Sequence, residues 1–163
     1  MYLFVLSILL ISCSEIYVST RDVKVKEGKV LLDGKTFNGS LVRIRTIGHP
    51  SEQNRVYDLT KIKKGIPVYQ EGYSYKKGNF KEITLNTGLK TYMSDLVEHT
   101  LDKNFYINYY PDGKIESKRE IIVEDNNVMT YKFHGKSEYF DQKGNLVKVE
   151  YWEDDKKIQK KDN

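Results

Sequence analysis

Residues 133–157 read FHGKSEYFDQKGNLVKVEYWEDDKK, and this stretch decides the fold class. An aromatic pair precedes the polar turn around Gly144, and after it Val147, Val149 and Tyr151 lie on one face of an alternating run. Alternation with a period of two is typical of a half-buried β-strand. Glycine accepts the positive φ that a tight hairpin turn requires. The stretch therefore predicts a β-hairpin.

The same arrangement of alternating runs and glycine turns continues upstream as far as Val23. We expect turns at the dipeptides or glycines that interrupt these runs, including Gly34, Gly78, Gly113 and Gly144. Asp-Gly between alternating apolar residues is among the strongest hairpin signals in a sequence. The chain is therefore predicted to be all-β, an antiparallel meander of consecutive β-hairpins.

Composition supports this fold class and excludes others. The 163 residues contain 13 tyrosines and no alanine. Alanine is the best helix former, whereas tyrosine favours strands, so a helix bundle is excluded. With 39% hydrophobic and 31% charged residues, the chain is too apolar to be disordered and too polar to cross a membrane many times.

The net charge of +4 does not indicate a nucleic-acid partner. A nucleic-acid-binding protein gathers its positive charge on one face or in one tract. Here lysines alternate with acids, for example from Lys24 to Lys29 and from Glu116 to Glu120. This pattern is typical of solvated strand faces.

Two segments depart from the strand pattern. Residues Ser94 to Leu101 favour a short helix, capped by Ser94 and carrying Leu96, Val97 and Leu101 on one side, or a continuation of the strand before them. Residues 153–163 are nearly all charged or amide side chains and are predicted to be a flexible, solvated tail.

The N-terminus carries a targeting motif. Residues Tyr2 to Ser12 are uncharged and mostly apolar, too few to span a bilayer but sufficient for the core of a signal peptide, assigned here to residues 1–12. No lysine or arginine precedes the run, and the alternative is a buried strand with a chance cysteine. The residues Leu10-Ile11-Ser12-Cys13 resemble a bacterial lipobox.

The lipobox resemblance implies that Cys13, the only cysteine, receives a diacylglyceryl group and becomes the new N-terminus. Residues 13–22 would then tether the domain to a membrane of the bacterial cell envelope. Ser14 follows the lipidated cysteine, which in proteobacterial lipoproteins favours the outer membrane over the inner one.

A weak internal repeat links three of the turns. One pattern recurs at 75–80, 110–115 and 140–146: an aromatic residue, then a polar turn that ends in glycine, then one polar and one apolar residue. The segment 133–157 resembles the variant MORN repeat of bacterial YwqK-like antitoxins, and residues 31–44 and 107–121 fit the same template more loosely. The resemblance implies one elongated, curved sheet over residues 23–152. A small sandwich or barrel is the alternative.

No catalytic or metal-binding constellation is visible. His49, His99 and His134 are isolated, and the chain has no second cysteine, so we expect neither a metal nor another cofactor. The first hypothesis is a membrane-anchored, non-enzymatic scaffold that binds another protein, with strand aromatics as contact candidates: Tyr73, Tyr75, Tyr109 and Tyr139. The resemblance suggests an antitoxin or immunity protein as an alternative. The other alternative is an envelope protein that binds carbohydrate or has an unrecognised enzymatic site.

Overall fold

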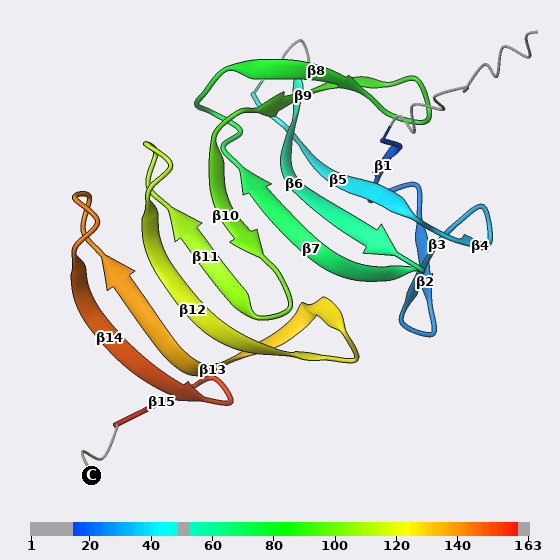
Figure 1. Cartoon of the computed structure of the whole chain (residues 1–163). Coiled ribbons are helices and arrows are strands. Elements are labelled where there is room, and N and C mark those ends of the chain that lie inside the picture. Colours follow the sequence, from blue (N-terminus) through cyan, green and yellow to red (C-terminus); the bar gives the residue numbers. More distant parts are fainter. Residues whose placement is uncertain (1–14, 49–52, 160–163) are drawn as a thin grey trace, which may run out of the picture.

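The computed structural model describes residues 15–48 and 53–159, and within these ranges every regular element is a β-strand (Figure 1). Twelve strands belong to one sheet and three to a small second sheet. The all-β prediction is confirmed. In the main sheet, neighbouring strands follow the order β1-β5-β6-β7-β10-β11-β12-β13-β14-β15, while β9 pairs with both β6 and β8.

The strands of the main sheet are mostly five to ten residues long. They are β1 (Tyr17–Ser19), β5 (Gly39–Thr46), β6 (Asn54–Lys63), β7 (Ile66–Tyr73), β8 (Phe80–Thr84), β9 (Lys90–Ser94), β10 (Val97–Leu101), β11 (Phe105–Tyr109), β12 (Ile115–Glu124), β13 (Asn127–Phe140), β14 (Leu146–Glu153) and β15 (Lys156–Ile158). The small sheet contains β2 (Lys24–Lys26), β3 (Lys29–Leu32) and β4 (Lys35–Thr36).

Two-residue turns with positive φ at both positions connect five of the hairpins. This is the type I′ geometry, whose twist matches that of the flanking strands. The pairs are Glu27–Gly28, Asp33–Gly34, Lys64–Gly65, Asp125–Asn126 and Asp154–Asp155. From β10 to β15, each strand pairs with the strand that follows it along the chain, so this part of the curved sheet is a run of consecutive hairpins (Figure 1).

The helix predicted between Ser94 and Leu101 is wrong, because this segment ends β9 and forms β10. The Ser94 hydroxyl accepts a hydrogen bond from the Leu96 backbone at 3.0 Å, which holds a bend between the two strands rather than capping a helix. β10 then pairs with β7 on one side and with β11 on the other. These two ladders satisfy its backbone better than one isolated helical turn would.

The sheet also extends beyond residues 23–152 at both ends. β1 lies within the predicted tether and pairs in parallel with β5, and its Val18 is fully buried. At the other end, β15 occupies part of the predicted tail because Asp154 and Asp155 form a turn. The predicted signal peptide, Cys13 and Ser14 lie outside the described residues. No helix in the described ranges is long and apolar enough to cross a membrane.

Three apolar clusters form the core. The first lies within the main sheet and joins Val42 of β5, Leu59 of β6 and Tyr73 of β7 to Ile83 of β8. The second lies between the small sheet and β5–β6, and contains Val18, Val30, Phe37, Leu41 and Ile62. The third, built on Leu101, Ile121 and Val128, holds the turn end of the β12–β13 hairpin. The remaining C-terminal part is more open, since Val147 and Val149 on β14 are exposed.

Candidate functional site

Strand register assigns each side chain to one of two sheet faces, because residues directly opposite each other point to the same side. One series of partners across β7 to β14 contains Glu71, Thr100, Ile107, Lys118, Glu138 and Val149. We call this side the groove face. The adjacent series contains Gly72, His99, Asn108, Ser117, Tyr139 and Lys148, and we call its side the arginine face.

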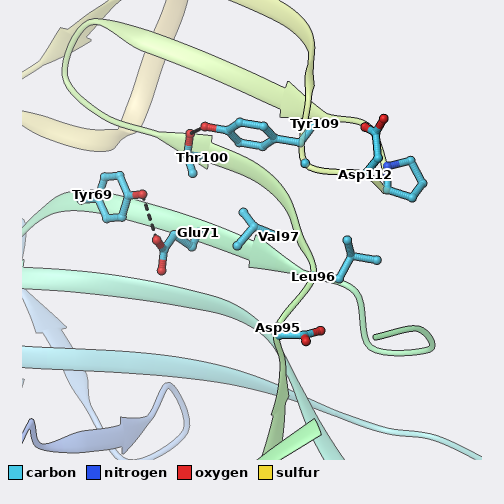
Figure 2. Close-up of a pocket in the computed structure, with 10 residues that line it drawn as sticks. Tyr69, Glu71, Asp95, Leu96, Val97, Thr100, Tyr109 and Asp112 are labelled. Atoms are coloured by element: carbon cyan, nitrogen blue, oxygen red, sulfur yellow. Dashed lines mark hydrogen bonds between the residues drawn. The ribbon is translucent and has the colours of Figure 1, made fainter. Parts of the chain in front are cut away.

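An open hollow of about 590 Å³ lies on the groove face where β7, β10 and β11 meet (Figure 2). Tyr69 and Glu71 of β7 line one wall, and the Tyr69 hydroxyl donates a hydrogen bond to Glu71 at 3.0 Å. Thr100 of β10 and Tyr109 of β11 line the other, and their hydroxyl oxygens lie 3.1 Å apart. Two tyrosine rings and two strand-borne polar groups thus surround one space.

The hollow forms because β10 and β11 separate at one end. Their pairing covers only His99–Leu101 opposite Tyr106–Asn108. Beyond it, register shifts at Val97/His99 in β10 and at Asn108/Tyr109 in β11 interrupt the ladders. Bulges of this kind bend a strand and re-aim its side chains. The sheet is therefore split at this edge instead of closed.

A second hollow, of about 520 Å³, adjoins the first and reaches His99 and Asn108 of the arginine face. Both are lined by Leu96, Val97, Tyr109 and Pro111. We use the name "groove" for the two hollows together. Such an elongated, open shape suits an extended chain better than a small molecule, since small-molecule sites enclose most of their ligand.

Charge differs between the two parts of the groove. The first hollow contains the carboxylates Glu71, Asp95 and Asp112 and no basic side chain, whereas the second is lined by both Lys76 and Lys77 and the carboxylates Glu98 and Glu116. The Asn79 side chain and backbone donate hydrogen bonds to Asp95 at 2.8 and 2.9 Å, which lowers the pKa of that carboxyl. Hydrogen bonds from Lys114 likewise lower the pKa of Asp112. Both carboxylates are therefore charged at neutral pH.

Two tyrosine hydroxyls hold the Glu71 carboxylate in place on the wall of the first hollow. Its two oxygens accept hydrogen bonds from Tyr69 and from Tyr73. Burial, followed by the bond to Glu71, raises the pKa of both tyrosines well above the ordinary value. Both hydroxyls therefore remain protonated donors, and the position of Glu71 is fixed.

The four tyrosines predicted as contacts do not share one surface. Tyr109 lines both hollows, and Tyr75 lines the second, where Arg45 donates to its hydroxyl at 2.9 Å. Tyr73 is buried in the first core cluster with only 8% of its surface exposed. Tyr139 lies on the arginine face and donates to Glu150 at 2.9 Å. Two of the four thus belong to the groove.

Tyr69, Glu71 and Thr100 are groove residues that the sequence analysis did not select. Tyr69, Glu71 and Tyr73 occupy alternate positions of β7 and so share one face of the sheet. Their meeting with Thr100 and Tyr109 depends on the pairing of strands about 30 residues apart, for which the sequence carries no local signal.

The predicted turn glycines all have positive φ, between +77° and +93°. Gly34 belongs to a two-residue turn. Gly113 and Gly144 belong to two separate loops, each closed by two backbone hydrogen bonds in the same pattern. Gly78 packs against the bend after β9, where an added Cβ would lie 2.3 Å from the Ser94 hydroxyl. Of these four, only Gly113 lines the groove.

Each of the two histidines in the described ranges lies near one carboxylate. His99 Nε2 lies 3.9 Å from Asp58, and His134 Nδ1 lies 3.5 Å from Asp154. His49 lies outside the described residues. Among residues 15–48 and 53–159, no group of three or more histidine, cysteine, aspartate or glutamate side chains is arranged to hold a metal ion.

Comparison with known proteins does not extend this description. No family model, curated protein or solved structure matches the chain.

Proposed function

We propose that this chain is a membrane-anchored, non-enzymatic module that binds an extended segment of a partner protein in the groove. The observation that carries the proposal is the split between β10 and β11, with Tyr69 and Tyr109 on its walls. Aromatic side chains supply much contact area with few rotatable bonds, and they are enriched at protein interfaces. The anchor rests on the lipobox residues that end in Cys13.

The groove also defines the kind of segment that fits. Glu71, Asp95 and Asp112 favour lysine or arginine side chains of the partner in the first hollow. The second hollow carries Lys76 and Lys77 together with Glu98 and Glu116, so it accommodates partner side chains of either charge.

The direct test is a cross-linked pull-down of the tagged full-length protein from its native envelope, read by mass spectrometry. Tyr109→Ala removes a groove wall, and Tyr139→Ala on the arginine face is the matched control. We expect a stoichiometric protein partner with the wild type and with Tyr139→Ala, and its loss with Tyr109→Ala. Equal recovery with Tyr109→Ala would contradict the proposal, as would the absence of any partner.

The anchor is tested separately by Cys13→Ser. Without the thiol no acyl chain can be attached, so we expect the protein in the soluble fraction after cell lysis. Unchanged membrane attachment of Cys13→Ser would contradict the anchor and leave the groove proposal intact.

A further inference from the structure

Arg119 on the arginine face holds a positive charge that the described residues leave without a polar partner. Its guanidinium carbon lies 3.3 Å from the ring centroid of Phe133 and 4.9 Å from that of Trp152. No hydrogen bond or ion pair joins it to residues 15–48 or 53–159. Arg119 therefore rests on an aromatic platform while its buried Nε lacks a hydrogen-bond partner.

Three buried polar atoms around Arg119 lack a hydrogen-bond partner. They are Arg119 Nε, Ser137 Oγ and Trp152 Nε1. Ser137 lies directly opposite Arg119 in the register and is fully buried, and Trp152 lies on the next strand, opposite Gly135. A buried polar group without a partner is unfavourable, and native structures contain few of them.

The chemistry of these atoms defines the missing partner. Arginine Nε and the indole nitrogen can only donate hydrogen bonds, and the serine hydroxyl can donate one. The serine oxygen can also accept a hydrogen bond, but the two nitrogens need an acceptor, and a negative charge on that acceptor would complement the guanidinium. A planar guanidinium stacked on a ring keeps its edge available for the two-oxygen contact that carboxylates and phosphates make.

The carboxylate nearest in the register is already occupied. Glu150, opposite Ser137, accepts hydrogen bonds from Lys148 and Lys157 at 2.7 Å each and from Tyr139 at 2.9 Å. Its single negative charge is thus shared by two lysines. Glu150 is therefore not available to pair with Arg119.

We propose that Arg119, Ser137 and Trp152 form a binding site for an oxyanion, the carboxylate or phosphate group of a ligand. The site shares no residue with the groove, so it is independent of the protein-binding proposal. Phe133 orients the guanidinium, while Ser137 and the indole supply further donors.

The single tryptophan of the chain gives the site its own reporter, because emission excited selectively from Trp152 comes from this place alone. The full chain, dissolved in an uncharged sugar detergent, is titrated with inorganic phosphate and separately with acetate at constant ionic strength. The indole N–H resonance is followed by NMR in the same samples. We expect a saturable change in both signals, and the anion that saturates at lower concentration identifies the group preferred.

Variants separate binding from a general salt effect. We expect Arg119→Gln to weaken binding at least about tenfold and Arg119→Lys to weaken it less, because lysine keeps the charge but loses the fork. Arg45→Gln, which removes a guanidinium stacked 4.7 Å from Tyr75, is the matched control and should bind as the wild type does. If Arg119→Gln fails to fold, Arg119→Lys and Ser137→Ala carry the comparison. No response of the wild type, a response that does not saturate, or an equal response in the folded Arg119 variants would overturn the proposal.

Discussion

Glu150 shows how much one residue can organise on a sheet face. It is among the few buried charged residues described, with 8% of its surface exposed. Hydrogen bonds from Lys148, Lys157 and Tyr139 together lower the pKa of its carboxyl to about 2. These bonds connect β13, β14 and β15 through a single side chain.

The lowered pKa predicts a pH dependence of stability. A carboxyl whose pKa falls on folding stabilises the folded state above its unfolded pKa, and this contribution is lost as the pH falls through the folded value. We therefore expect the free energy of unfolding of the wild type to decrease between about pH 4.5 and pH 2, partly through Glu150.

Glu150→Gln should flatten this part of the profile, because glutamine does not titrate. Urea unfolding at a series of pH values measures the effect, with the exposed Glu153→Gln as control. Identical profiles for the wild type and Glu150→Gln would refute the role assigned to the carboxylate.

At the scale of the strand, the pairing of β7 with β10 depends on a missing side chain. Gly72 lies opposite His99, and a Cβ added to Gly72 would lie 1.9 Å from the imidazole ring. The ring occupies this space while stacking on Tyr106, with 5.5 Å between the ring centroids. Gly72 is therefore needed for close approach and not for a special φ.

We predict that Gly72→Ala destabilises the fold by about 1–3 kcal/mol through overpacking. In a His99→Ala background the same substitution should cost clearly less, since the imidazole is gone. Thermal or urea unfolding of the four proteins gives this double-mutant cycle. An additive cycle, with no coupling between the two sites, would show that the imidazole is not the obstacle.

The hairpins are the part of the fold that the sequence predicts best. Dipeptides such as Asp33–Gly34 and Lys64–Gly65 are local signals, and the backbone at these positions has the positive φ that the turn requires. The turn at Asp154–Asp155 has no glycine, and the charged sequence there predicts a solvated tail instead. A backbone hydrogen bond and the Asp155 carboxylate join it to Phe133, 22 residues earlier.

The strand β10 shows why the remaining elements escape prediction. Leu96, Val97 and Leu101 are spaced as on a helix face, and the local pattern also fits a strand. Only the distant partners Gln70 of β7 and Tyr106 of β11 select the strand. The same limit applies to Arg119, Phe133 and Trp152, because three strands must pair before these side chains meet.

For the whole molecule, the two faces carry different surfaces. The groove face has an open split whose first hollow is lined by carboxylates, while the second carries both lysines and glutamates. The arginine face has a row of contacting aromatic rings that runs from His99 through Tyr106 and Tyr131 to Phe133 and Trp152. A sheet with two distinct faces can hold two different ligands at once.

The measurement that tests the central proposal most directly is site-specific photocross-linking in the native envelope. A photoreactive residue replaces Asp112, which is exposed on the groove rim, or Asn126, which is exposed in the β12–β13 turn away from the groove. We predict a single discrete protein adduct from position 112 and none from position 126. The same adducts from both positions, or no adduct from position 112, would contradict the proposal that the groove binds a partner protein.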